Sequence, residues 1–382
     1  MDHPFDALAL ADLRRRRSAK WSVYPADVLP AWIAEMDYPL ATPIRAALHG
    51  AIDADDCGYA DPAGLGDAFA PWAEATWGWR VAPRDVRVVA DVVTGIAELL
   101  RITTAPGDGV LIEPPVYPPF AGTIRALGRT VVAAPLRRSD TGWAPDLAAI
   151  ERAYVAGARV HLLCSPHNPT GLVYPAATLA AIAGLAERHD VLVLADEIHA
   201  PLTLAGATHA PFPTVSAAAA RRSIVLTSAS KTWNLAGLKA AVMIAAAEGP
   251  RAILARLPPE LSYHAGHLGI VGARAAFTAG EPWRTSVLAI LARNRALLAE
   301  LLAHHLPALR WHPPAAGYLA WLDATALGLG DDPAAVFRAR GKVALSPGPS
   351  FGVEGAGWAR LNFATSAALL EQLVVGLARA VG

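Results

Sequence analysis

Residues 223–234 read Ser-Ile-Val-Leu-Thr-Ser-Ala-Ser-Lys-Thr-Trp-Asn, a short apolar run that ends in a polar turn. A near-continuous apolar run of this length is typical of a strand that is covered on both faces. Longer stretches rich in Ala and Leu separate it from similar runs, which predicts parallel strands joined by crossover helices. The other clear runs of this kind are 86–90, 109–113, 160–164 and 191–195.

Polar residues follow three of these predicted strands. The segments are Ser165-Pro166-His167-Asn168-Pro169, Asp196-Glu197-Ile198-His199 and Ser228-Ala229-Ser230-Lys231. Because the carboxyl ends of parallel strands meet at one edge of a sheet, where open α/β folds bind ligands, we predict a site there.

The chain has 382 residues, more than one hydrophobic core usually supports. After about residue 282 its texture changes to a long helix rich in Ala, Leu and Arg, followed by short strands at 318–322 and 360–363. We therefore expect a large domain over 48–284. A smaller α+β domain is expected to combine 1–47 with 285–382.

Composition excludes several classes of function. Lys plus Arg and Asp plus Glu number 33 each, so no net charge attracts nucleic acid or an anionic membrane. Two cysteines make neither a disulfide framework nor a zinc site on their own, which favours a reducing compartment. Residues 1–13 carry Asp2, Asp6 and Asp12 and lack the pattern of a signal peptide, and no apolar run reaches membrane-spanning length. A cytoplasmic protein is expected.

Two kinds of catalytic site are also disfavoured. The histidines at 161, 167 and 199 have no metal-site spacing and no accompanying Cys/His cluster, so no metal is expected. Ser165 and Ser230 lack a nucleophile elbow, which argues against a serine hydrolase.

Lys231 is the lysine with the most informative surroundings. A lysine at a strand end is usually a surface residue. Here, however, the hydroxyls of Ser228 and Ser230 can donate to a phosphate. Partial desolvation near a second cation, for which Lys239 is the candidate, would let Lys231 lose its proton more easily.

The neighbouring segments each admit two interpretations. Asp196 either pairs with a buried cation or caps a helix. Asn168 either donates into the cleft or forms an Asx turn. Tyr117, in the proline-rich segment 114–120, either stacks on a flat ring or belongs to the core. The helix start after the strand 86–90 offers an anion site of low specificity.

Taken together, these motifs resemble those of the fold-type-I enzymes that use pyridoxal 5′-phosphate (PLP) and are related to aspartate aminotransferase. Within that superfamily the chain is similar, nearly end to end, to the MalY/PatB-type cystathionine β-lyases. That similarity rests on residues 28–38 (Val-Leu-Pro-Ala-Trp-Ile-Ala-Glu-Met-Asp-Tyr), Gly58-Tyr59, 115–120 and 230–239. It implies a large domain with a mostly parallel seven-stranded sheet flanked by helices.

The resemblance also implies residue roles. Lys231 would be the Schiff-base lysine and the base that removes the substrate Cα proton. Asp196 would face the pyridinium nitrogen, Asn168 the ring oxygen and Tyr117 the ring face, while Arg360 would grip the substrate carboxylate beside Tyr117 and Asn168. The remaining cofactor contacts would be Val92, Val93, His199, Ser228, Ser230, Lys239 and, from the other subunit of a homodimer with its active site at the interface, Tyr59.

Three positions depart from this family. Asp91 stands where the family has a glycine, and we expect its carboxylate to point away from the phosphate. Ser165 replaces an asparagine, and Pro201 replaces an acidic residue. These changes bear on substrate preference more than on cofactor binding.

The expected activity is carbon–sulfur β-elimination from cystathionine or a related cysteine S-conjugate, which yields a thiol, pyruvate and ammonia. Transamination is the alternative, because both reactions share the steps up to Cα deprotonation. A regulatory or scaffold role on the same fold is a more remote alternative.

Overall fold

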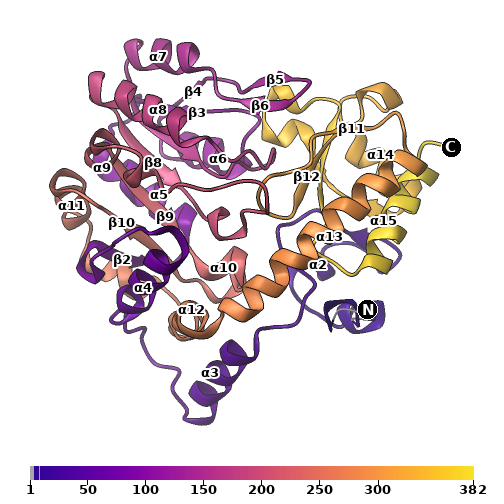
Figure 1. Cartoon of the computed structure of the whole chain (residues 1–382), viewed down its shortest axis with the longest axis horizontal. Coiled ribbons are helices and arrows are strands. Elements are labelled where there is room, and N and C mark those ends of the chain that lie inside the picture. Colours follow the sequence, from indigo (N-terminus) through magenta and orange to yellow (C-terminus); the bar gives the residue numbers. More distant parts are fainter. Residues whose placement is uncertain (1–3, 8) are drawn as a thin grey trace.

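The computed structural model describes residues 4–7 and 9–382 (Figure 1). Within them, the larger sheet has seven strands in the order β2-β10-β9-β8-β7-β3-β4. Only β10 runs antiparallel to its neighbours, so the mostly parallel seven-stranded sheet expected from the sequence is confirmed. The strands are β2 (Val86–Val89), β3 (Gly109–Ile112), β4 (Thr130–Ala133), β7 (Ala158–Cys164), β8 (Leu192–Asp196), β9 (Ser223–Thr227) and β10 (Ala241–Ile244).

Helices cover both faces of this sheet. In β8, Val193 and Ala195 belong to one core while Leu194 belongs to the core on the opposite face, as strand alternation requires. One face is covered by α4 (Leu65–Trp77), α7 (Leu147–Val155), α8 (Ala176–Arg188), α9 (Ala217–Arg222) and α12 (His267–Ala279). The other is covered by α5 (Val92–Thr103), α6 (Pro118–Ala126) and α11 (Glu248–Ala255).

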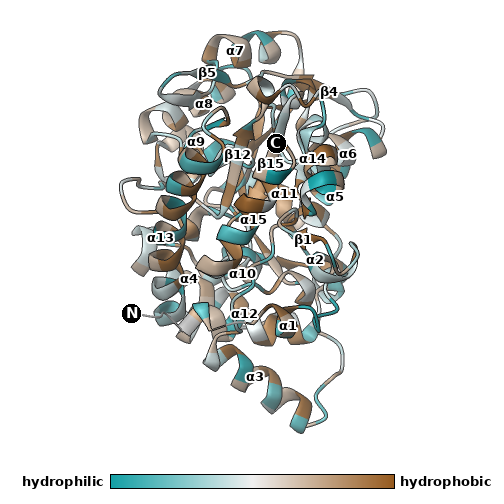
Figure 2. Ribbon diagram, turned by 90° about the vertical axis from the view of Figure 1, so that its right-hand side faces the viewer, coloured by the Kyte–Doolittle hydropathy of each residue, from teal (hydrophilic) through white to brown (hydrophobic). Residues whose placement is uncertain are grey.

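A second body is built on an antiparallel sheet in the order β11-β12-β15-β14. The predicted strands 318–322 and 360–363 correspond to β12 (Leu319–Asp323) and β15 (Trp358–Asn362), and the predicted long helix is α13 (Glu281–His305). Figure 2 shows both apolar and polar residues along α13, and its buried residues recur every three or four positions, at Val287, Ile290, Leu291, Asn294, Leu298 and Leu302. The other elements of this body are β11 (Arg310–Trp311), β14 (Ser346–Pro347), α14 (Pro333–Gly341) and α15 (Ala367–Arg379).

The N-terminal part of the chain joins this second body. Its β1 (Leu29–Pro30) pairs in parallel with β13 (Val343–Ala344), and Phe5, Met36 and Tyr38 enter the core around α13. The domain boundaries at 47/48 and 284/285 stay a prediction; α13 runs through the second of them without a break. Residues 1–3 and 8 of the predicted small domain, including Asp2, lie outside the described residues.

The remaining short elements lie at the edges of the two bodies. Helix α3 (Thr42–Asp53) projects from the rest of the molecule in both views (Figures 1 and 2). The others are α1 (Leu10–Leu13), α2 (Ala19–Ser22), α10 (Ala229–Thr232) and the hairpin of β5 (Arg137–Ser139) and β6 (Gly142–Ala144).

Residues 32–36, which we call the crossing segment, run between the two bodies with every carbonyl oxygen bonded to a side chain. From the second body, Arg360 and Ser346 donate to Trp32 O, and Asn362 donates to both Ile33 O and Glu35 O. From the large sheet's side, Lys231 donates to Ala34 O and Asn234 donates to Met36 O. Side chains of both bodies thereby hold one stretch of backbone.

In the part of the chain that the structure describes, no helix combines the length and apolarity needed to cross a bilayer. The cytoplasmic location stays a prediction.

We expect Gly269→Ala to destabilise the protein. A Cβ atom at Gly269 would lie 2.1 Å from the carbonyl oxygen of Leu238, so α12 or the backbone before Lys239 would have to shift. The free energy of unfolding should fall by about 1–3 kcal/mol. Gly184→Ala in α8 is the matched control, because its Cβ meets nothing within 4 Å and the change should raise stability by about 0.5–1 kcal/mol. Urea unfolding of both variants checks this; equal effects would contradict it.

Candidate active site

A cavity of about 430 Å³ lies at the carboxyl edge of the large sheet, where the crossing segment and β15 face it. Its volume is in the range that accommodates a small ligand. The structure brings together every predicted site residue except Tyr59. These are Val92, Val93, Tyr117, Asn168, Asp196, His199, Ser228, Ser230, Lys231, Lys239 and Arg360.

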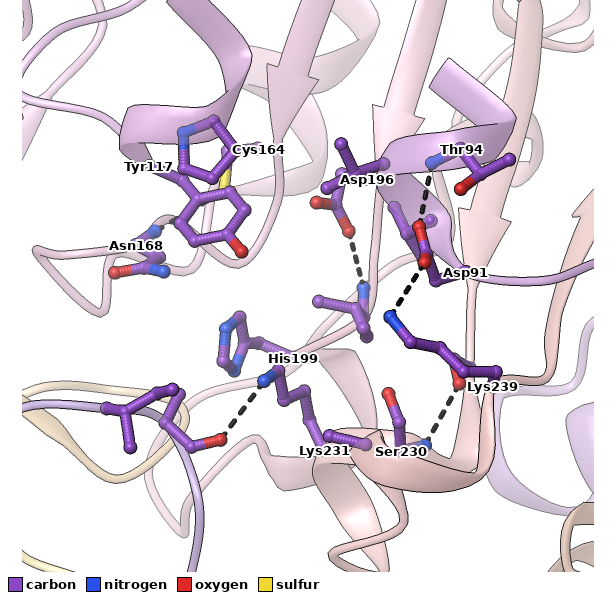
Figure 3. A pocket seen from close by; sticks show the side chains of 18 of the residues that line it. Asp91, Thr94, Tyr117, Cys164, Asn168, Asp196, His199, Ser230, Lys231 and Lys239 are labelled. Atoms are coloured by element: carbon purple, nitrogen blue, oxygen red, sulfur yellow. Dashed lines mark hydrogen bonds and ion pairs between the residues drawn. The ribbon is translucent and has the colours of Figure 1, made fainter. Parts of the chain in front are cut away.

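Lys231 lies in α10, immediately after β9. Its Nζ atom donates to the carbonyl oxygen of Ala34 at 3.0 Å (Figure 3). Burial and the nearby charge of Arg360 lower the pKa of Lys231 to about 8, although the carboxylate of Asp196 works in the opposite direction. A substantial fraction of this lysine is therefore neutral at mildly alkaline pH, when it can act as a nucleophile or base.

Asp196 is the last residue of β8 and is almost completely buried. Its Oδ1 atom accepts a hydrogen bond from the amide of Ile198 at 3.1 Å. Burial nevertheless raises the pKa of Asp196 to about 7. No cationic side chain among the described residues is within bonding distance of it. A ligand that offers a protonated nitrogen would relieve this cost.

Arg360 extends from β15 into the cavity and is 5% exposed. It donates to Asn168 Oδ1 at 2.9 Å, to Trp32 O at 2.9 Å and to Ser346 Oγ at 3.0 Å. Its Nε atom is buried and has no partner among the described residues. Burial lowers the pKa of Arg360 to about 10, so the guanidinium is still charged at neutral pH, and its Nε donor is free.

Asn168 is fixed by this contact. Since its Oδ1 atom accepts from Arg360, the amide nitrogen is left to donate into the cavity. The backbone N–H of Asn168 contacts Cys164 Sγ at 3.4 Å.

Tyr117 and His199 both line the cavity (Figure 3). Burial raises the pKa of the Tyr117 hydroxyl, so this aromatic side chain is uncharged. Burial, together with the charges of Lys231 and Arg360, lowers the pKa of His199 to about 3. The imidazole is therefore neutral.

The N-terminus of α5 forms a third part of the cavity. The amide of Thr94 is already bonded to Asp91 Oδ1 and that of Gly95 to Asp91 O. The amides of Val92 and Val93 begin the helix and have no intrahelical acceptor. They are therefore free to bind an anion, and the phosphate contact that the resemblance implies for them stays a prediction.

One expectation at this end of the cavity is wrong, and the role of Ser228 stays a prediction. Asp91 does not point away: it lines the cavity, and its Oδ2 atom forms an ion pair with Lys239 Nζ at 3.0 Å. Ser228 is near the site, but its hydroxyl donates to Ala240 O at 2.6 Å and accepts from the Ser230 amide, so in this arrangement it has no proton to give a phosphate. The Ser230 hydroxyl makes no hydrogen bond with a described residue.

Three predicted or unusual positions lie apart from these contacts. Tyr59 is 94% exposed and does not enter the cavity of its own chain. Pro201 lies in a 3-10 turn whose carbonyl accepts from Arg284 at 2.7 Å. The hydroxyl of Ser165 is buried without a partner among the described residues.

Sequence reasoning missed the residues that hold the predicted ones in place. Tyr318 shares Ala34 O with Lys231 through a 3.1 Å hydrogen bond, Ser346 braces Arg360, and Cys164 lines the wall. Cys164 could have been found, since it ends a predicted strand just before Ser165. Tyr318 and Ser346 carry no such signal.

The described residues include no group of three or more His, Cys, Asp and Glu side chains arranged to hold a metal ion.

Comparison with known sequences adds three findings. The sequence model for aminotransferase class I and II matches residues 65–377. A protein of Mycobacterium leprae with the provisional name cystathionine β-lyase is 41% identical over 99% of this chain and 98% of its own length. The cystathionine β-lyase of Corynebacterium glutamicum is 33% identical over 95% of this chain and 96% of its own.

Among solved structures, a protein of Corynebacterium diphtheriae, provisionally described as a PLP-dependent β-cystathionase, superposes with a TM-score of 0.93. It is 34% identical and covers 98% of both chains. The similarity therefore extends over both bodies of the structure.

Asp196→Asn should stabilise the ligand-free protein in a pH-dependent manner. Because the folded-state pKa of Asp196 is raised to about 7, the native protein holds this proton more tightly than the unfolded chain. Wild-type stability should therefore decrease, relative to the variant, as pH rises from about 4 to 7. The difference should reach about 2–4 kcal/mol above pH 7. Urea unfolding across this pH range measures it, and a difference independent of pH would argue against the shifted carboxyl.

Proposed function

Because this chain belongs to the aminotransferase class I and II family, we propose that its cavity holds pyridoxal 5′-phosphate and cleaves the carbon–sulfur bond of cystathionine or a related cysteine S-conjugate. The observation that carries the proposal is the placement of Lys231, Asp196 and Arg360 around one cavity. Each is a buried charged group whose environment favours a charged ligand or loss of its charge.

The donor set fits this cofactor. The unpaired carboxylate of Asp196 suits a ring nitrogen that carries a proton, and the free amide nitrogen of Asn168 suits a ring oxygen. Tyr117 offers an aromatic face, and the amides of Val92 and Val93 suit a phosphate. Lys231 is the amine that would form the covalent link. When bound, the cofactor ring accepts the electron pair left on the substrate Cα atom after proton loss.

Arg360, Lys231 and Asp196 then have separate roles in the proposed reaction. Arg360 binds the substrate α-carboxylate with its free Nε donor while its other nitrogens hold Asn168 and Trp32 O in place. Lys231, neutral above a pH of about 8, takes the Cα proton. A protonated ring nitrogen would pair with the Asp196 carboxylate, which would hold the carboxylate ionised and the nitrogen protonated.

The lining of the cavity includes the apolar residues Ile33, Ala34, Pro119 and Ile198, and Arg360 is the one arginine among the described residues that line it. The choice of a thioether substrate rests on the names of the two relatives. Transamination is the second candidate, since the family takes its name from it and it uses the same proton transfer at Lys231.

We also propose that the enzyme is a homodimer. Tyr59 lies in the connection between α3 and α4 and is almost fully exposed, as is expected of a side chain that would reach a cavity in the partner subunit. Helix α3, which precedes this connection, buries only Ile44 along its length and projects from the rest of the molecule (Figure 1).

The activity is tested on PLP-loaded protein with L-cystathionine, with and without an added 2-oxo acid. We expect equimolar thiol and pyruvate in the absence of the 2-oxo acid. Lys231→Ala should lower this rate by about a hundredfold or more, because the base is lost. Partial rescue of that variant by methylamine would separate loss of the base from misfolding. Strict dependence on a 2-oxo acid would instead identify an aminotransferase.

Arg360→Lys should raise the KM for cystathionine by about tenfold or more. A lysine ends in a single nitrogen, so it cannot reproduce the planar set of donors that holds Asn168 and Ser346 while Nε binds a carboxylate. Arg222→Lys, which changes an arginine paired with Asp190 outside the cavity, is the control and should leave KM unchanged. Steady-state kinetics of both variants measure the effect; an unchanged KM in Arg360→Lys would remove this residue from substrate binding.

A further inference from the structure

The carboxylate of Asp91 lies in the part of the cavity that would hold the cofactor phosphate. Its two oxygens are both engaged: Oδ1 accepts from the Thr94 amide at 2.8 Å and Oδ2 pairs with Lys239 Nζ at 3.0 Å (Figure 3). Burial works to raise the pKa of Asp91, but these two contacts lower it overall, so the group is ionised. A negative charge therefore stands where a second negative charge would bind.

Local structure does not require that charge. The residue has φ −157° and ψ 168°, an extended conformation that any residue adopts. Its capping bond to Thr94 is of a kind that a neutral side chain makes elsewhere in this chain, since Ser216 caps α9 and Ser366 caps α15 in the same manner. The negative charge at position 91 thus has its effect on Lys239 and on the anion site.

Lys239 is the cation nearest to the start of α5. Lys231 is turned to the other side of the cavity, toward Ala34 O, and Arg360 is committed to Asn168, Trp32 O and Ser346. A phosphate monoester carries about −1.5 to −2 charges at neutral pH. It would meet two helix amides, the Ser230 hydroxyl and one lysine, and that lysine is already neutralised by Asp91.

We propose that Asp91 competes with the cofactor phosphate for Lys239 and so weakens the binding of PLP, making the cofactor readily exchangeable. The proposal rests on the proposed function, because it needs PLP to occupy this cavity. Phosphate binding draws Lys239 away from Asp91 and leaves the two anions close together. A ligand without a phosphate group leaves the Asp91–Lys239 pair intact.

The test compares PLP with pyridoxal, which has the same ring and aldehyde but no phosphate. Dissociation constants are measured by titrating the cofactor-free protein and following tryptophan fluorescence. Asp91→Asn keeps the capping oxygen and removes the charge. Asp146→Asn is the matched control, because Asp146 caps α7 through the amide of Ala149 at 3.0 Å and does not line the cavity.

We expect Asp91→Asn to bind PLP roughly tenfold more tightly than the wild type, as the loss of one nearby charge in a partly exposed site implies. Its affinity for pyridoxal should not change, and Asp146→Asn should match the wild type for both ligands.

Weaker or unchanged PLP binding by Asp91→Asn would falsify the proposal, since Asp91 would then support Lys239 or play no part. Equal tightening for PLP and pyridoxal would overturn it too, because the effect would not involve the phosphate. These results leave the proposed function intact if the wild type binds PLP and cleaves cystathionine. If the wild type binds no PLP, both proposals fall.

Discussion

The crossing segment, residues 32–36, is the constraint on which the site depends. Five consecutive carbonyl oxygens face side-chain donors from both bodies of the protein, and the central one, Ala34 O, receives both Lys231 and Tyr318. Burying backbone carbonyls that have no donor is costly. The segment can therefore be buried only where side chains donate to its carbonyl oxygens. The hydrogen bond that helps to bury this segment between the two bodies therefore also positions Lys231.

Arg360 likewise holds several segments of the chain together. Its guanidinium bonds Trp32 O in the crossing segment, Asn168 in the loop after β7 and Ser346 in β14, and it stacks on Phe351 at 5.0 Å. One side chain thus joins three segments that are far apart in the sequence. Because this leaves Nε free, the residue that organises the wall also has a donor for a carboxylate.

The cavity contains buried charged side chains that their neighbours do not fully neutralise. Burial raises the pKa of Asp196 and lowers the pKa values of Lys231 and Arg360, in each case in favour of the uncharged form. Such displacement is costly in the free protein and is relieved by a ligand of matching charge, a pattern that is common at functional sites. Asp91 and Lys239 differ, because they satisfy each other before any ligand arrives. The cavity is thus prepared for a ring and a carboxylate more than for a phosphate.

The sequence by itself determined the parallel sheet, the edge at which its polar residues meet, and the identity of most residues there. The strand predicted from the apolar run at the start of 223–234 is β9 (Ser223–Thr227), because an apolar run and a polar turn are local signals. Only the tertiary structure decided which partners these residues have. Asp91 pairs with Lys239, 148 positions away, and the Ser228 hydroxyl donates a hydrogen bond to Ala240 O. Tyr318 shares an acceptor with Lys231, and Ser346 holds Arg360. All of these contacts follow from packing between distant segments. The spacing of apolar residues indicates which face of a helix or strand is buried. It does not indicate which residues pack against that face.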